Sequence, residues 1–442
     1  MKSGNLFLLS VLLIAGCGGS GGVDVGVDPT VLQRVDVRER EALRPFLRDS
    51  PYAEFLKECA LIESAEDGCK LRRLPFIGQS GNTVTHNDVM NRLLVTHDWM
   101  GQRFSTLLQQ APADVLELFA SVTVVSIGST VRPSNYWTGT GGIQLDPRHL
   151  WLTLEEKANV SIEEDYRSGY GKELNFWSLQ AARIGGEEAY PQYSLTSFTE
   201  RSLKDIEFRV YSLLYHELGH AVDYVHPDLM PMVDTTLNTS DAIARLSQNR
   251  SSSLLINEWP LTSTQMSGLA RVQFQGLRAT EQQIKYTPTD VGSFMAIDGA
   301  IKYYSYHTER EDFANLFEFT MMKKNFGMDL LIGYVTKPAN EDFVQCSDLI
   351  LGWGQHNRIS DPLVLPRAQW VVDRVYGSTQ ENDVFFNSLV GLKRDMTVGL
   401  DWCVNRDSVI TAKTRQTGMS TRHSVSLETN TQLQFERYDG HH

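Results

Sequence analysis

The sequence lacks the features that mark several common protein classes. It has 41 lysines and arginines against 54 aspartates and glutamates, a formal net charge of −13, so no positive surplus attracts nucleic acid or an anionic membrane surface. No C-x-x-C pair is present, which argues against a cysteine zinc site or a dithiol redox motif. The glycines at 139–142 do not form G-x-G-x-x-G or lead into a helix, so we expect no phosphate-binding loop. The negative net charge leads us to expect no nucleic-acid partner.

Long apolar runs are scarce too, and the N-terminal one is short. Lys2 precedes an apolar run from Leu6 to Ile14, which is too short for a permanent transmembrane helix. The run ends in Ile14-Ala15-Gly16-Cys17, which resembles a bacterial lipoprotein cleavage site. That resemblance implies that residues 1–17 are a signal peptide and that Cys17 becomes a lipidated first residue anchored in the cell envelope, with Gly18 favouring the outer membrane. An ordinary secretory signal is the alternative.

Removal of Cys17 as a lipid anchor leaves an even number of cysteines. An even number in an exported chain predicts two disulfides. A bond between Cys59 and Cys69 would close a small loop around the turn at 66–68, and a bond between Cys346 and Cys403 would clamp the C-terminal part. The other two pairings remain open.

Composition and residue spacing predict an α+β protein. With 41% hydrophobic and 21% charged residues, the chain suits one large globular domain or two smaller ones. We expect a flexible tether at 18–45, a main domain at 46–400 with an insertion at 227–300, and a polar tail at 401–442. The expected elements are a helix at 85–110, strands at 121–127 and 142–145, and a surface excursion at 155–195. A helix should start between Phe198 and Leu203 and run to about Asp223, another should start at Glu311 and end near Gly327, and helices with loops should follow over 320–400.

The glycines before the strand at 142–145 suggest a close approach of another backbone. An edge strand that binds substrate by β-addition would fit this position, and a plain glycine turn fits it equally well.

The motif that carries chemistry is His216-Glu217-Leu218-Gly219-His220. On a helix, residues four apart lie one turn apart on the same face, so both imidazoles can reach one Zn²⁺. Glu217 then stands beside the metal, where it can act as a general base toward a metal-activated water. Asp223 is nearly on the face of His216 and is placed to orient a ligand imidazole, although an exposed helix-end role is nearly as plausible.

A catalytic zinc site needs a third protein ligand, and two candidates compete. His226 gives the spacing H-E-x-x-H-x-x-G-x-x-H of the metzincins, with Asp223 in place of the glycine. Glu311 begins an apolar-striped helix and shares a face with Asn315, and Asp312 is a weaker substitute. Ala314 on that helix and Gly219 on the motif helix are small enough for the two helices to approach closely.

The stretch from Tyr304 to Asn315, together with H-E-L-G-H-A-V-D, resembles the gluzincin branch of the zincin metallopeptidases, and within it the catalytic domain of anthrax lethal factor. The resemblance implies a zincin-like fold, with a small mixed sheet and the motif helix in one lobe and a mainly helical second lobe. It also implies Zn²⁺ held by His216, His220 and Glu311, with Asn315 as the partner of a ligand histidine.

The same resemblance implies that Tyr304 stabilises the oxyanion or the leaving amine, with Tyr306 as a rival. We therefore expect a zinc metallopeptidase that acts on peptide or protein substrates. A non-catalytic zinc-binding lipoprotein that recognises a partner protein is the alternative, as is a metzincin-type peptidase that uses His226.

Overall fold

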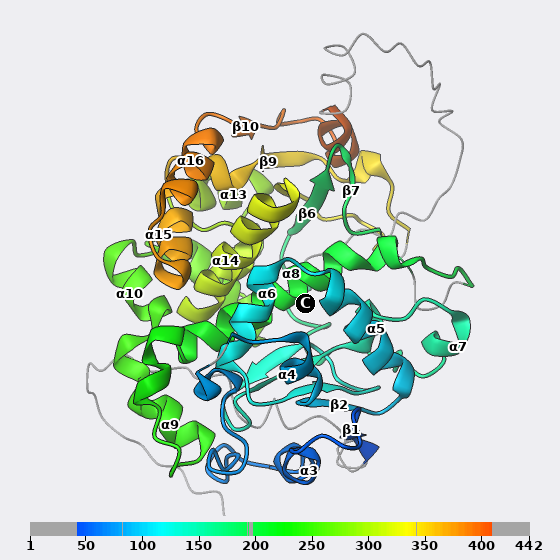
Figure 1. Cartoon of the computed structure of the whole chain (residues 1–442). Coiled ribbons are helices and arrows are strands. Elements are labelled where there is room, and N and C mark those ends of the chain that lie inside the picture. Colours follow the sequence, from blue (N-terminus) through cyan, green and yellow to red (C-terminus); the bar gives the residue numbers. More distant parts are fainter. Residues whose placement is uncertain (1–41, 82, 192, 194–197, 342, 409–442) are drawn as a thin grey trace, which may run out of the picture. The chain divides into compact units, whose positions relative to one another are not determined.

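The computed structural model describes residues 42–81, 83–191, 193, 198–341 and 343–408. Within them it has the predicted α+β character, with one mixed and one antiparallel five-stranded sheet (Figure 1). The signal peptide, Cys17, most of the tether and the end of the tail at 409–442 lie outside these residues, and the domain boundaries stay predictions.

The first sheet is mixed, with the strand order β1-β2-β3-β5-β4. β2, β3 and β5 are parallel, while β1 and β4 are antiparallel to their neighbours. The strands are β1 (Arg44–Pro45), β2 (Leu93–Val95), β3 (Val125–Ile127), β4 (Asn135–Trp137) and β5 (Gly142–Leu145).

The strand predicted at 142–145 is confirmed as β5, but it lies inside the sheet and β4 forms the edge. Gly142 marks a close backbone approach, as expected. A Cβ atom there would lie 2.3 Å from the carbonyl oxygen of Val124, a distance that no side chain tolerates.

The single helix expected at 85–110 is wrong. The chain forms α4 (His86–Met90), then strand β2, then α5 (Asp98–Gln110). Every residue of β2 is buried. Because a strand that is covered on both faces is apolar throughout, it carries no alternation of polar and apolar residues. Its leucines and valine therefore fit the helical spacing of the apolar residues in the flanking segments, and the strand was read as part of one helix.

Two long helices are confirmed where the sequence predicted them. α8 (Leu203–Tyr224) begins after Ser202, whose side chain forms a capping box with Asp205. α14 (Glu309–Phe326) begins after Thr308, which accepts a hydrogen bond from the Glu311 backbone N–H at 3.2 Å. Both side-chain caps satisfy backbone donors that a helix start leaves without an intrahelical partner.

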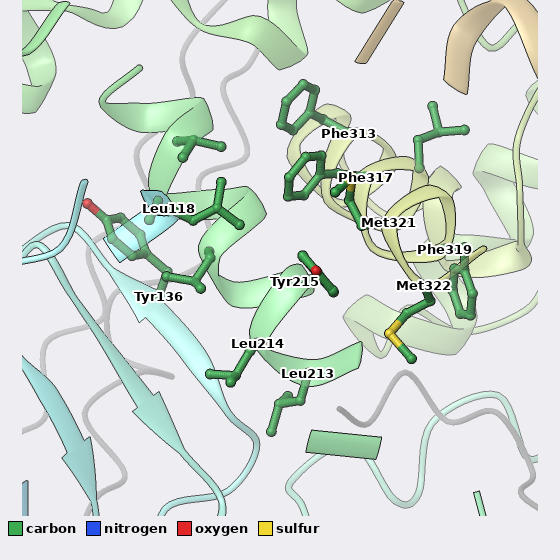
Figure 2. Close-up of a cluster of buried hydrophobic side chains, with 14 of the residues drawn as sticks. Leu118, Tyr136, Leu213, Leu214, Tyr215, Phe313, Phe317, Phe319, Met321 and Met322 are labelled. Carbon is green, nitrogen blue, oxygen red and sulfur yellow. The ribbon is translucent and has the colours of Figure 1, made fainter. Parts of the chain in front are cut away.

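α8 and α14 pack closely against each other. A Cβ atom on Gly219 would lie 3.3 Å from the Phe317 ring and 3.4 Å from the Ala314 Cα, so the two small residues predicted to allow close approach do face each other. Figure 2 shows Tyr215 of α8 turned toward Phe317 of α14 within this apolar contact.

The second sheet is antiparallel and was not predicted. Its order is β10-β9-β8-β6-β7, formed by β6 (Phe176–Ile184), β7 (Glu187–Glu188), β8 (Asp329–Thr336), β9 (Leu351–His356) and β10 (Arg394–Asp395). The expectation of a surface excursion at 155–195 and of only helices and loops at 320–400 is therefore wrong. β6 pairs with β8 from Phe176↔Thr336 to Arg183↔Asp329, and a partner so distant in the chain leaves no local signal.

The remaining helices include a series within 227–300. Their bounds are α3 (Ala53–Ala60), α6 (Ala113–Leu118), α7 (Leu154–Lys157), α9 (Thr239–Arg245), α10 (Ser251–Glu258), α11 (Thr264–Gln275), α12 (Glu281–Lys285), α13 (Pro288–Ala296), α15 (Leu365–Tyr376) and α16 (Gln380–Leu389). α10 and α15 both contact α14. None of the helices in the described residues is long and apolar enough to cross a membrane.

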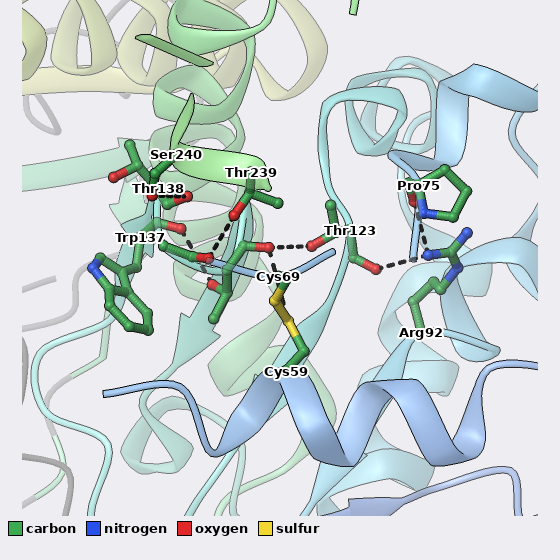
Figure 3. Close-up of a disulfide and its surroundings, with 11 residues drawn as sticks. Cys59, Cys69, Pro75, Arg92, Thr123, Trp137, Thr138, Thr239 and Ser240 are labelled. Atoms are coloured by element: carbon green, nitrogen blue, oxygen red, sulfur yellow. Dashed lines mark hydrogen bonds between the residues drawn. A yellow bond between two sulfur atoms is a disulfide. The ribbon is translucent and has the colours of Figure 1, made fainter. Parts of the chain in front are cut away.

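Both expected disulfides, Cys59–Cys69 and Cys346–Cys403, are present. The first joins α3 to the segment that contains Cys69 (Figure 3). The Cys69 N–H donates to the Gly139 carbonyl at 2.9 Å, and the Cys69 carbonyl accepts from Thr239 N–H at 2.9 Å. The disulfide thus ties α3 to the turn between β4 and β5 and to the start of α9.

Candidate metal centre

Three side chains from two helices converge at one point. His216 and His220 stand one turn apart on α8, and Glu311 lies in the first turn of α14. Their ligand atoms lie within 4.8 Å of one another, and the group can hold a metal ion. The close α8–α14 contact at Gly219 brings the carboxylate within reach of both imidazoles.

The distances fit a tetrahedral ion. Glu311 Oε2 lies 3.2 Å from His216 Nε2 and 3.5 Å from His220 Nε2. In a tetrahedral site with ligand bonds of about 2.0–2.2 Å, two ligand atoms lie about 3.3–3.6 Å apart. Glu311 Oε2 is also buried without a well-formed hydrogen bond in the described residues, so a cation between the three atoms would give it a partner.

The electrostatics of the group favour a cation as well. Burial opposes ionisation of Glu311, but the imidazoles of His220 and His216 outweigh it and hold the pKa of this carboxyl well below its usual range. A carboxylate that stays charged between two histidines is a normal third zinc ligand. The donor set therefore suits Zn²⁺, while the identity of the ion rests on this chemistry alone.

Glu217 is buried beside the two histidines, with 1% of its surface exposed. Its Oε2 atom has no hydrogen-bond partner among the described residues. Burial is the main cause that raises the pKa of its carboxyl to about 7, against the lowering effect of the neighbouring imidazoles. A carboxyl with a pKa near neutrality is suited to accept a proton and release it again.

The other ring nitrogen of His216 is held by Glu318, which the sequence analysis missed. Glu318 Oε2 lies 3.2 Å from His216 Nδ1, and the same carboxylate accepts a hydrogen bond from Ser212 and faces Lys302 Nζ at 3.6 Å. Glu318 is seven residues after Glu311 and so nearly on the same helix face. The i, i+7 spacing of Glu311 and Glu318 is the signal in the sequence that could have identified this contact.

These contacts decide the charge of His216 in the absence of a metal. Burial alone lowers the pKa of the imidazole, but the nearby carboxylates of Glu311 and Glu318 outweigh burial and raise the pKa to about 9. Carboxylate contacts of this kind fix the ring orientation of a ligand histidine.

The expected supporting roles of Asn315 and Asp223 are not found. Both polar side-chain atoms of Asn315 are buried without a hydrogen bond in the described residues, so the contact expected from Asn315 belongs to Glu318. Asp223 Oδ1 accepts the Ser252 backbone N–H at 2.6 Å. Asp223 therefore caps α10. The sequence could not predict this role, because the partner comes from another helix.

Tyr304 is placed at the centre, as expected, and Tyr306 is not. The Tyr304 hydroxyl donates to Glu311 Oε1 at 3.2 Å and accepts from Arg167 at 3.1 Å. Tyr306 instead donates to Asp298 at 3.0 Å. Arg167, which also pairs with Asp165, is a second residue at the site that the sequence analysis missed, because it lies in a stretch without a recognisable motif.

The two rival ligands face elsewhere. His226 Nε2 binds the Arg374 carbonyl at 2.7 Å, and Asp312 forms a buried ion pair with Arg367. Within the described residues, the other group with metal-ligand geometry contains Cys346 and Cys403 with Asp401. Its two sulfurs form the disulfide. The metzincin alternative thus lacks its third ligand in this structure.

Comparison with known proteins returned no matching family model, no matching curated protein and no matching solved structure. The site must therefore be interpreted from its own residues.

Proposed function

We propose that this protein is a zinc-dependent metallopeptidase of the gluzincin type. The single observation that carries the proposal is the convergence of His216, His220 and Glu311 at distances that suit one tetrahedral ion. The motif glutamate, Glu217, is buried directly beside them. Histidine, histidine and glutamate with one open position is the ligand set of catalytic zinc in peptidases.

Zinc held there would polarise a peptide carbonyl and lower the pKa of water toward about 7. The side chains supply the remaining chemistry. Glu217 accepts the proton from the attacking water and passes it to the leaving amine, for which a pKa near 7 is well matched. Glu318 keeps the His216 ring oriented through Nδ1. The Tyr304 hydroxyl lies beside Glu311, which supports the proposal that it donates a hydrogen bond to the developing oxyanion.

The arrangement of the first sheet and α8 supports a zincin-like fold. The mixed sheet ends in the antiparallel edge strand β4, which contacts the motif helix. An edge strand offers free backbone groups to an extended peptide. We propose β4, rather than β5, as the strand that receives substrate by β-addition.

A non-catalytic zinc-binding protein is the alternative. The burial of Glu217 favours the enzyme. A buried carboxyl oxygen without a hydrogen-bond partner lowers the stability of the fold, and a catalytic role would explain this cost. A purely structural zinc site would gain nothing from a base at this position. The proposed location is the bacterial cell envelope, through a lipid on Cys17, and it rests on the sequence of the N-terminus alone.

The deciding experiment compares the zinc-loaded wild type with Glu217→Gln on a broad peptide library, with mass spectrometry of the products. We expect cleavage by the wild type and a loss of at least about a hundredfold in the variant, since a positioned general base contributes about 10²–10⁴ in rate. Equal zinc content in the two proteins is the control. Identical product patterns would refute peptidase activity at this site.

A further inference from the structure

A chain of hydrogen-bonded side chains leads from the protein interior to the candidate metal centre. Arg167, between α7 and β6, donates from its guanidinium group to the Tyr304 hydroxyl oxygen at 3.1 Å. The same hydroxyl donates to Glu311 Oε1 at 3.2 Å. The contacts therefore end on the second oxygen of the candidate ligand carboxylate, whose Oε2 lies beside the two histidines.

The chemistry of the groups fixes the direction of these hydrogen bonds. A guanidinium group has five N–H donors and no acceptor, so the Tyr304 oxygen has to accept from Arg167. A tyrosine hydroxyl carries a single hydrogen, which must then point to another acceptor. In this structure that acceptor is Glu311 Oε1. Arg167 thus makes Tyr304 a hydrogen-bond donor toward the metal centre.

Arg167 is itself held in place by Asp165. The Arg167 backbone N–H donates to Asp165 Oδ1 at 2.7 Å, and its guanidinium group lies 3.3 Å from Asp165 Oδ2. Both residues are almost fully buried, with 4% and 5% of their surfaces exposed. Replacement of a buried ion pair by apolar residues of similar volume is often neutral or stabilising. Stability alone therefore does not explain this pair beside the site.

The Tyr304 ring is fixed by aromatic neighbours. It stacks on His307, with centroids 5.2 Å apart and planes inclined by 24°. Phe274 meets it edge to face, with centroids 4.8 Å apart. Because the ring is packed and its oxygen is held by Arg167, rotation about the C–O bond redirects the hydrogen without moving the ring.

We propose that Arg167 is a positioning residue that acts through Tyr304. It holds the hydroxyl oxygen from behind, so that the hydroxyl hydrogen can turn from Glu311 Oε1 to the developing oxyanion of the substrate. The guanidinium charge also polarises the O–H bond, and a donor that is already oriented needs no reorganisation during the reaction. This inference rests on the proposed function and adds a residue to its machinery.

The first test is kinetic and compares zinc-loaded variants on the peptide that the wild type cleaves best. Tyr304→Phe should lower kcat about a hundredfold, because loss of one oxyanion donor typically costs about 10²–10³. Arg167→Met should lower kcat about tenfold and leave KM within about twofold. Arg167→Lys keeps a cationic donor and should lose less than about threefold. The double variant Arg167→Met/Tyr304→Phe should be no slower than Tyr304→Phe, because the hydroxyl through which Arg167 acts is already absent.

The second test measures binding and needs no turnover. The probe is a phosphinic peptide of the same sequence, whose tetrahedral anionic group mimics the charge that develops on the substrate. Its Kd should rise about tenfold in Arg167→Met, and it should change less than about twofold when Arg167→Met is added to Tyr304→Phe. Zinc content and circular dichroism serve as the checks on metal loading and folding.

Arg183→Met is the matched control. Arg183 is also a buried arginine that pairs with one aspartate, Asp407, and it lies on β6. Its substitution should leave kcat and the Kd of the phosphinic peptide unchanged. Should Arg167→Met fail to fold, Arg167→Met with Asp165→Asn replaces it in every comparison, because no buried carboxylate is then left without a partner.

Three results would overturn the inference. An unchanged kcat in Arg167→Met, while Glu217→Gln abolishes cleavage, would refute the role of Arg167 and leave the peptidase proposal standing. A double variant clearly slower than Tyr304→Phe, or a rise in KM without a fall in kcat, would mean that Arg167 supports the fold and does not act through Tyr304. Absence of any cleavage by the zinc-loaded wild type would refute the proposed function and this inference with it.

Discussion

His216 Nδ1 lies 3.2 Å from the Glu318 carboxylate, and both side chains are almost fully buried. This contact leaves Nε2 facing Glu311, so the ring that provides a metal ligand is fixed from behind by a charged group. Ser212 and Lys302 bind the same carboxylate from its other sides. Glu318 is therefore a positioning residue for the candidate metal centre.

Substitution Glu318→Gln should weaken zinc binding about 10- to 100-fold, because partners of ligand histidines typically contribute that much. Asn315→Ala, one turn away on the same helix, should leave zinc affinity within about twofold, since its polar atoms form no hydrogen bond in the described residues. Competition with a chelator of known affinity measures both. An equal loss in the two variants would mean that helix packing, not the carboxylate, controls the site.

The third ligand can be tested by metal content. Glu311→Ala should lose bound zinc on dialysis, because two histidines alone hold the ion weakly. His226→Ala should retain one zinc per chain, since His226 binds the Arg374 carbonyl. Atomic absorption on the two purified proteins gives the answer, with circular dichroism as the check on folding. Loss of zinc only from the His226 variant would reverse the assignment.

Zinc affinity should depend on pH through His216. Its pKa is raised from 6.5 to about 9 by the two carboxylates, so its proton stabilises the metal-free protein fully below pH 6.5 and less as pH rises toward 9. Zinc binds the deprotonated ring and must displace this proton. The association constant should rise about tenfold per pH unit between pH 7 and 9. Calorimetry in buffers of different ionisation enthalpy should show about one proton released, and a flat profile would contradict this.

The helix contact at Gly219 should tolerate little extra volume. Gly219→Val places a branched side chain where a Cβ alone already lies 3.3 Å from Phe317 and 3.4 Å from Ala314. We expect a loss of about 1–3 kcal/mol in the free energy of unfolding, together with weaker zinc binding, because the ligands lie on the two helices that are forced apart. Chemical denaturation measures the first effect and chelator competition the second.

Gly268→Val is the matched control for the helix contact. Gly268 lies within α11, where an added Cβ meets only the end of the Gln283 side chain. Valine has a slightly higher helix propensity than glycine, so this variant should change the free energy of unfolding by less than about 1 kcal/mol and keep its zinc affinity. Equal zinc loss in both glycine variants would show that global destabilisation, not the α8–α14 distance, is responsible.

The sequence by itself determined the parts of this protein that depend on neighbours in the chain. The i, i+4 spacing of His216 and His220 and the small residues Gly219 and Ala314 were readable, because helix geometry fixes which residues share a face. They located both long helices and the candidate ligand Glu311.

Only the tertiary structure decided the partners that come from distant segments. It assigned the Nδ1 contact of His216 to Glu318, brought Arg167 to Tyr304, and turned Asp223 and His226 to other uses. It also paired β6 with β8 across more than a hundred residues. A buried polar group binds whichever partner the packed fold brings within hydrogen-bond distance. The spacing of residues along the chain does not predict that partner.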